Sequence, residues 1–195
     1  MTVYCATTNR GKLREFQDAS GDIEIAVLPA IETIPPPEET GATFEENAAL
    51  KAVYYSRFAS GLVFADDSGL AVDALGGQPG VRSARFAGPG ANDAANNTFL
   101  LDLLRGVEQR TARFLCVIAL AQDGQLVRTF QGAVEGRIID TPRGDQGFGY
   151  DPIFLYPPAN RTFAEIGTSE KFHLSHRGEA IRRLLDYLRT EFPHR

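Results

Sequence analysis

The sequence is short of three things: cysteine, long apolar runs and positive charge. Only two cysteines, Cys5 and Cys116, occur among the 195 residues. Each lies inside a short apolar stretch of the kind that forms a buried strand, and their spacing matches neither a disulfide framework nor a zinc site. We therefore expect two reduced thiols in the protein core.

The scarcity of long apolar runs argues against a membrane span. The longest run, "FLCVIALA", has eight residues, whereas a helix needs roughly 20 to cross a bilayer. The first residues also lack the basic leader and apolar stretch of a secretory signal. The sequence thus predicts a cytoplasmic protein that does not insert into membranes.

The charge balance is acidic, with a formal net charge of −5. Proteins that bind nucleic acid polymers depend on clustered lysine and arginine, so a general nucleic-acid surface is not expected. Any anion that this protein binds must be held by a few local cations.

Composition and pattern together predict one α/β domain over residues 1–195. The chain is 43% hydrophobic and 23% charged, as globular proteins usually are, and its length suits one core better than two. The segments that we expect to be strands are 2–7, 61–65 and 112–139, and the expected helices are 43–58, 92–107 and 175–192. Such a mixture favours a sheet with both parallel and antiparallel pairs, flanked by helices.

Local signals set several boundaries within this pattern. Thr43 and Glu46 have the spacing of a capping box, which predicts a helix that runs to about Phe58. The Asp123-Gly124 pair lies between two apolar stretches and predicts a β-hairpin. Ser175 is the expected N-cap of the last helix.

The first candidate site is "ATTNRGKL", residues 6 to 13, where a strand passes into a helix. Free amide groups, the helix dipole and Lys12 could form an anion cradle there. The stretch is not a P-loop, because Ala6 stands in place of the first glycine and Leu13 in place of the serine or threonine. An ordinary strand-to-helix turn is the alternative interpretation.

Lys51 is the second candidate, because it shares a helix face with apolar side chains. Phe44, Ala48, Tyr55 and Phe58 lie three or four residues apart on that face. The lysine is therefore directed toward the core side. The alternative is a lysine whose stem packs on apolar groups while its ammonium reaches water.

The third candidate is the pair Asp66 and Asp67 in "FADDSGLAVD". Strand residues alternate between faces, so only one of the two is expected to face a site if the strand continues. A turn at Ser68-Gly69 would place a carboxylate at a strand end, which suits a hard cation such as Mg2+. An Asx-turn or helix cap is the alternative. The acidic segment "PPPEETG" offers a further oxygen ligand from either of two neighbouring residues, Glu38 and Glu39.

Two later stretches could hold a base. In "GFGYDPIF" the glycines allow a close backbone approach and Phe148 and Tyr150 could stack on a flat ring; the alternative is a tight turn with core aromatics. In "KFHLSHRGEA" His176 and Arg177 lie in a first helical turn, where cations are disfavoured. An arginine can fork onto a 6-oxopurine, and Lys171 adds a donor for phosphate.

Together these blocks identify a resemblance to the inosine triphosphate pyrophosphatase family, whose members hydrolyse non-canonical purine nucleoside triphosphates. The similar blocks follow one another in order: "TTNRGKLREF", "TFEENAALKA", "DDSGLAVDALGGQPGVRSARFAG", "GFGYDPIF" and "SHRGEA". They span nearly the whole chain. One local difference is "SEKFH", where many members read "EEKN"; Lys171 is kept.

The resemblance implies roles for particular residues. Those implied to bind phosphates are Thr7, Thr8, Asn9, Arg10, Gly11, Lys12 and Lys51. Asp67 is implied to be the proton acceptor and, with Glu38 or Glu39, a ligand of Mg2+. The other implied substrate contacts are Ser68, Phe148, Gly149, Tyr150, Asp151, Lys171, His176 and Arg177.

The resemblance also implies a fold, an assembly and a reaction. It implies an elongated α/β fold with two lobes, the nucleotide between them, and a homodimer. The reaction is hydrolysis of ITP, dITP or XTP to the monophosphate and pyrophosphate. A nucleotide-dependent phosphotransferase and a non-catalytic nucleotide sensor are the alternatives.

Overall fold

The structure is a computed structural model that describes residues 1–193. The chain divides into two compact units, each assembled from separate segments of the sequence. Unit 1 comprises Met1–Asp67, Cys116–Gly132 and the segment from His176 onward, and unit 2 comprises Ser68–Leu115 and Ala133–Ser175. The two units are described in turn.

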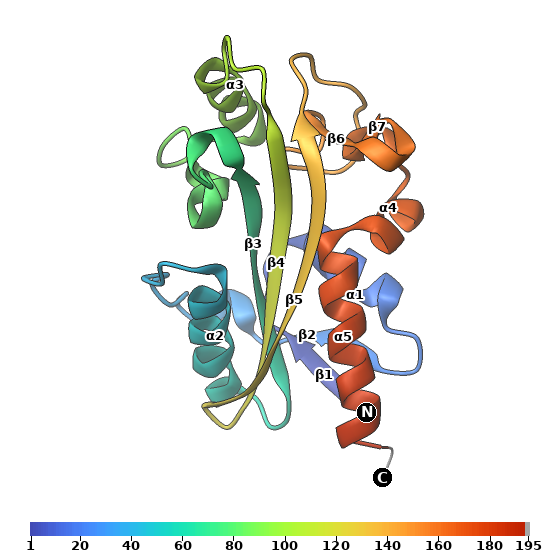
Figure 1. The fold of residues 1–195 in the computed structure, drawn as a ribbon. Helices are drawn as coiled ribbons and strands as arrows, with labels where there is room; N and C mark the ends of the chain where they lie inside the picture. The colour runs from blue at the N-terminus through green and yellow to red at the C-terminus, as the bar shows by residue number, and fades with distance from the viewer. Residues whose placement is uncertain (194–195) are drawn as a thin grey trace. The chain divides into compact units, whose positions relative to one another are not determined.

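Seven strands form one mixed sheet in the order β2-β1-β3-β4-β5-β6-β7 (Figure 1). β1 pairs in parallel with both β2 and β3, whereas β6 pairs antiparallel with β5 and β7. The strands are β1 Thr2–Cys5, β2 Glu24–Val27, β3 Val63–Val72, β4 Thr111–Gln122, β5 Gln125–Ile138, β6 Phe154–Tyr156 and β7 Arg161–Thr162. The expected combination of parallel and antiparallel pairs is confirmed.

Helices flank this sheet, as predicted. The α-helices are α1 Arg10–Ala19, α2 Phe44–Tyr55, α3 Asp93–Leu103, α4 Thr168–Leu174 and α5 His176–Glu191. Short 3₁₀ helices cover Ile31–Thr33, Ser56–Phe58, Asp73–Leu75, Gly80–Arg85, Pro157–Ala159 and Phe163–Glu165. Among residues 1–193, no helix combines the length and the apolar character that a membrane span requires.

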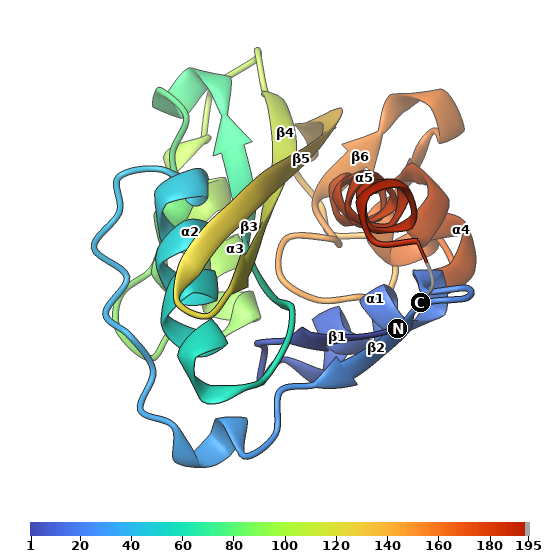
Figure 2. The same cartoon turned by 90° about the horizontal axis from the view of Figure 1, so that it is seen from below.

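Unit 1 has helices on both faces of its strands. Ala48, Ala52 and Tyr55 of α2 pack on Val63 and Ala65 of β3. α1 packs against α5 (Figure 2). The start of α5 lies so close to β5 that a β-carbon on Gly132 would be 2.0 Å from the His176 carbonyl oxygen, so only glycine fits there.

Unit 2 is built around a cluster of aromatic rings. Phe114, Phe154 and Phe163 have ring centroids 4.5 to 5.9 Å apart. Leu100 and Leu104, from α3 and the residue that ends it, complete the same core. Burial of apolar surface contributes about 25 cal/mol per Å² to the free energy of folding, so these large side chains are the main source of stability in unit 2.

The local predictions hold where short-range chemistry decides the structure. Thr43 caps α2 in a capping box with Glu46, and Asp123 and Gly124, with φ of 51° and 77°, form a two-residue turn between β4 and β5. Cys5 and Cys116 are free and buried. α5 begins directly after Ser175, which also ends α4; a capping hydrogen bond from Ser175 to α5 stays a prediction.

Two boundary predictions are wrong. α2 ends at Tyr55 and passes into a 3₁₀ turn, so Phe58 is 48% exposed instead of lying on the buried face. β3 continues through Ser68 and Gly69 to Val72, and no turn forms there. The Ser83 hydroxyl lies where a side chain at position 69 would stand and accepts a hydrogen bond from the Leu70 amide, which keeps the strand extended.

Candidate active site

The N-terminus of α1 is an exposed helix end immediately after β1. Asn9 caps it, with its side-chain oxygen accepting a hydrogen bond of 3.0 Å from the Lys12 amide. The Thr7 hydroxyl accepts a bond from the Asn9 amide at 3.2 Å. Thr8, Asn9, Arg10 and Gly11 are exposed, and Thr7 is half-buried. The partial positive charge of a helix N-terminus suits phosphate oxygens.

Lys12 is held by Asp66. Its ammonium lies 2.8 Å from Asp66 Oδ2, and the aspartate side chain is only 2% exposed. Burial by itself would raise the pKa of Asp66, but Lys12 first, then Arg177 and Lys51, outweigh it and lower that pKa to about 2. Asp66 is therefore an anion that balances the charge of Lys12.

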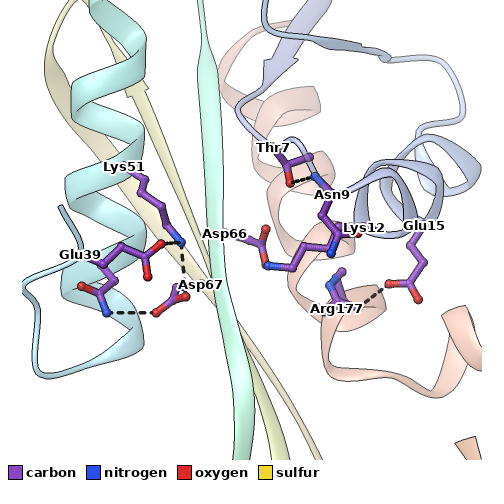
Figure 3. A network of polar contacts seen from close by, with 10 residues as sticks. Thr7, Asn9, Lys12, Glu15, Glu39, Lys51, Asp66, Asp67 and Arg177 are labelled. Atoms are coloured by element: carbon purple, nitrogen blue, oxygen red, sulfur yellow. Dashed lines mark hydrogen bonds and ion pairs between the residues drawn. The ribbon is translucent and has the colours of Figure 1, made fainter. Parts of the chain in front are cut away.

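Asp67 faces α2 on the other side of β3, as strand alternation predicts (Figure 3). Its Oδ1 lies 3.3 Å from the Lys51 ammonium, and its Oδ2 accepts a hydrogen bond of 3.2 Å from the Asn47 amide group. Asn47 and Lys51 are four residues apart on α2, so the helix presents both to one carboxylate.

Lys51 also binds Glu39, at 3.0 Å from Oε1. Its side chain is 14% exposed, and its ammonium is paired with carboxylates of both Glu39 and Asp67. The segment that carries Glu39 is fixed by Asn47, which accepts a hydrogen bond of 2.8 Å from the Gly41 amide. Glu38 is exposed, and the structure thus brings Glu39 to Lys51.

The network has more negative than positive charge close to Lys51. Burial would lower the pKa of Lys51, but Asp67, Asp66 and Glu39 raise it. Burial also raises the pKa of Asp67; Lys51 opposes this, while Glu39 and Asp66 add to it. Both pKa values are therefore raised: the carboxylates around one ammonium favour the protonated form of Lys51, and burial together with the neighbouring carboxylates favours the protonated form of Asp67. Asp67 accepts a proton more readily than an isolated aspartate does.

The residues here fit a divalent cation only in part. Within the described chain, no group of three or more His, Cys, Asp and Glu side chains converges as a metal site. Two carboxylates, Asp67 and Glu39, do converge on the Lys51 ammonium. Mg2+ is commonly bound through one or two carboxylates plus substrate phosphates, and this pair meets that requirement.

His176 and Arg177 lie at the start of α5 and are both 3% exposed. The Arg177 guanidinium forms an ion pair of 2.5 Å with Glu15 of α1. Burial would lower the pKa of Arg177, but Glu15 and Asp66 raise it. Arg177 is thus fixed by carboxylates of unit 1, and its contact with a base stays a prediction.

In unit 2 the glycine-rich segment divides into exposed and buried parts. Phe148 is half-buried, while Tyr150 is 4% exposed and its hydroxyl donates to the Ser83 carbonyl at 2.8 Å. Burial, with Asp93, raises the pKa of Tyr150. The structure supports the core alternative for Tyr150. Ser68, in the same unit, is half-buried within β3.

Asp151 and Lys171 form a buried ion pair of 2.6 Å under this segment. Asp151 also accepts a hydrogen bond from the Phe148 amide at 2.9 Å, and the Lys171 ammonium lies 5.1 Å from the Phe148 ring centroid. A β-carbon at Gly147 would be 2.1 Å from Asp151 Oδ2. The pair therefore fixes the backbone on which Phe148 stands.

Several of these residues are not signalled by the sequence. Glu15, Asn47 and Asp93 hold site residues or their backbone, yet each looks like an ordinary helix residue. The i, i+4 spacing of Asn47 and Lys51 is the one signal that could have indicated a shared partner. The Glu15–Arg177 pair joins residues 162 apart, which no local pattern reveals.

A mixed sheet flanked by helices, in which Lys12 of α1 and Lys51 of α2 pair with the two aspartates of β3, defines an α/β protein with a candidate anion site. The chain belongs to the Ham1 family, whose model matches residues 3–187. This result confirms the resemblance read from the sequence.

Relatives and solved structures agree. A dITP/XTP pyrophosphatase of Acidobacterium capsulatum is 50% identical, with 95% of this chain and 97% of the relative covered. The dITP/XTP pyrophosphatase of Thermus thermophilus is 46% identical, with 100% of this chain and 95% of the relative covered. The structure of the Staphylococcus aureus Ham1 protein superposes with a TM-score of 0.88 at 39% identity, covering 98% of this chain and 100% of the other.

Proposed function

We propose that this protein hydrolyses non-canonical purine nucleoside triphosphates, namely ITP, dITP and XTP, to the nucleoside monophosphate and pyrophosphate, and so clears them from the nucleotide pool. The observation that carries the proposal is the network in unit 1, where Lys12 and Lys51 form ion pairs with the two aspartates of β3. The names of the relatives supply the substrate class.

The phosphates bind at the N-terminus of α1. The Lys12 ammonium and the backbone amides at the start of α1, apart from those of Asn9 and Lys12, which bond Thr7 and Asn9, supply positive charge, and Lys51 supplies more from α2. These groups stabilise the charge that grows on the departing pyrophosphate, which is the main demand of phosphoryl transfer. The remaining implied contacts, from Ser68 and Lys171, belong to unit 2 and stay predictions.

Asp67 accepts the proton of the water that attacks the α-phosphorus. A raised pKa favours this role, because a carboxylate with a low pKa is a weak base. Asn47 and Lys51 hold the two carboxylate oxygens in place. Cleavage between the α- and β-phosphates gives pyrophosphate directly.

Asp67 and Glu39 are the residues that would hold Mg2+. A bound Mg2+ would neutralise phosphate charge and act as a Lewis acid. In this proposal Lys51 keeps the two carboxylates together until the cation arrives with the nucleotide. Chelation with EDTA is expected to abolish pyrophosphate release, and addition of Mg2+ to restore it.

The base is recognised through its 6-oxo group. His176 and Arg177 provide donors, and a good bidentate arginine contact is worth roughly 1–3 kcal/mol of discrimination. Donors oppose the 6-amino group of adenine. Phe148 provides an aromatic ring for stacking, worth roughly 1–3 kcal/mol per base in comparable proteins.

The test is to incubate the purified protein with Mg2+ and ITP, dITP, XTP, GTP or ATP in separate samples and to measure pyrophosphate and orthophosphate. We expect pyrophosphate from the first three and little from GTP and ATP. Orthophosphate alone would move the cut to the terminal phosphate. A diphosphate product with a phosphorylated acceptor would indicate a phosphotransferase, and no product a nucleotide sensor.

Three expectations accompany this function. The chain acts as a single pyrophosphatase domain, since the family match spans residues 3–187. It works as a homodimer, which light scattering after size exclusion tests. It is cytoplasmic, which fractionation of the source cells tests.

A further inference from the structure

Both backbone polar groups of Gly149 form hydrogen bonds to side chains of one helix, α3. Its N–H donates to Asp93 Oδ2 at 2.7 Å, and its carbonyl accepts from Asn97 Nδ2 at 3.0 Å. All three residues belong to unit 2. The N–H and the carbonyl of Gly149 both form hydrogen bonds to side chains of a single helix. Two such bonds fix the orientation of the turn as well as its position.

The helix is built to do this. Asp93 and Asn97 are four residues apart on α3, so their side chains lie on one face. Asn92 caps the helix through a 2.8 Å bond to the Ala95 amide, which fixes the turn that carries Asp93. Gly149 has φ of 63°, a left-handed conformation that glycine adopts without steric cost.

Asn97 keeps this contact at a cost. It is 9% exposed, and its side-chain oxygen has no hydrogen-bond partner among residues 1–193. A buried acceptor without a partner destabilises the fold, and an apolar side chain would avoid that penalty. The amide orientation follows from its neighbour, because the opposite rotamer would set Oδ1 against the Gly149 carbonyl. The bond to Gly149 is therefore the contact that asparagine provides here.

We propose that Asp93 and Asn97 are positioning residues that set the direction of the Phe148 ring for recognition of the substrate base. The inference rests on the proposed function, in which Phe148 stacks on the base. Asp151 holds the Phe148 amide from the other end of the segment. Because the backbone is held at both Phe148 and Gly149, the ring does not have to be ordered when a nucleotide binds.

The test compares Asn97→Ala and Asp93→Ala with matched controls. Asn96→Ala is the first control, because Asn96 is an equally buried neighbour on α3 that bonds Ala84 and Ala87 instead. Asp93→Asn is the second, because its side-chain oxygen still accepts the Gly149 N–H. Kinetics with ITP are measured together with hydrogen exchange of the peptide that contains residues 147–151.

We expect both test variants to raise KM for ITP by about tenfold, the loss expected for one hydrogen bond, with kcat changed less than threefold. Exchange in residues 147–151 rises by about the same factor. Asp93→Asn behaves as the wild type, and Asn96→Ala lowers the melting temperature while KM changes less than twofold.

Wild-type KM and exchange in both test variants would overturn the inference. An equal rise in KM for Asn96→Ala would also overturn it, because the effect would then follow general stability. If the wild type releases no pyrophosphate from ITP, the proposed function fails on its own. Calorimetric Kd for ITP then replaces KM: tenfold weaker binding supports the positioning role and unchanged binding overturns it.

Discussion

Asp67 is the side chain on which the proposed chemistry depends. We expect Asp67→Asn to lower kcat for ITP by roughly 10²- to 10⁴-fold, the usual contribution of a positioned proton acceptor. The amide is nearly isosteric but has one acceptor oxygen, so it keeps only one of the two hydrogen bonds that Asn47 and Lys51 donate to Asp67; the circular dichroism spectrum should not change. Asp18→Asn, at an exposed position of α1, is the control. Near-normal turnover of Asp67→Asn would remove the assigned base.

Asp66 makes a pH-dependent contribution to stability. Its pKa falls from 3.8 in a model peptide to about 2 in the fold, so at intermediate pH the unfolded chain binds more protons than the native one. The contribution, about 2 kcal/mol, is complete above roughly pH 5. It disappears as the pH falls through 4 toward 2 and below.

Urea unfolding between pH 2.5 and 6, in EDTA, measures this contribution. The free energy of unfolding should fall more steeply with acid in the wild type than in Asp66→Asn, which lacks the titrating group. Parallel curves for the two proteins would show that the Lys12–Asp66 pair does not lower the pKa of Asp66.

Helix α2 connects local capping with the site. Its capping box fixes the first turn, and Asn47 and Lys51 follow on the next turns. Thr43→Ala is expected to lower the free energy of unfolding by about 1 kcal/mol and to raise KM, since the helix start also holds the segment of Glu39. Thr98→Ala, exposed on α3, is the control. A drop in stability with unchanged KM would separate the cap from the site.

The same helix shows how far sequence reasoning reaches. The capping box, the Asp123-Gly124 turn and the alternation of Asp66 and Asp67 depend on neighbours in the chain, and all three were predictable. The length of β3 was not, because it depends on Ser83 standing against Gly69. The partners were likewise hidden, since Asn47 meets Asp67, and Glu39 meets Lys51, only through the fold.

For the protein as a whole, burial decides the behaviour of the two cysteines. Burial, with Asp66, raises the pKa of the Cys5 thiol, and burial does the same for Cys116. Both should react with a thiol reagent at least tenfold more slowly in the native protein than in denaturant, because the reactive species is an exposed thiolate. Labelling followed by mass spectrometry measures this, and rapid native labelling would contradict the buried positions.

The overall architecture was accessible from the sequence for a physical reason. Alternating apolar segments and glycine-rich connections specify which stretches form strands and helices, and so the mixed sheet. The identity of site residues followed from their order in recognisable blocks. What the sequence could not specify is which carboxylate meets which cation, as with Glu39 instead of Glu38, because such pairings depend on the tertiary path of each loop.

Because Asp66 and Asp67 lie on opposite faces of β3, the site depends on whether the number of residues that precede them in the strand is odd or even. Insertion of one residue before Asp66 would move each aspartate to the opposite face of β3, so that each would face the lysine that now pairs with the other. Insertion of two residues would return each aspartate to its original face, displaced by two residues along the strand. Residues 63–65 are fully buried, so their composition is restricted to apolar side chains and their number is fixed as well. Homologues and designed variants should therefore vary residues 63–65 only among apolar side chains that fill the same core, without insertion or deletion.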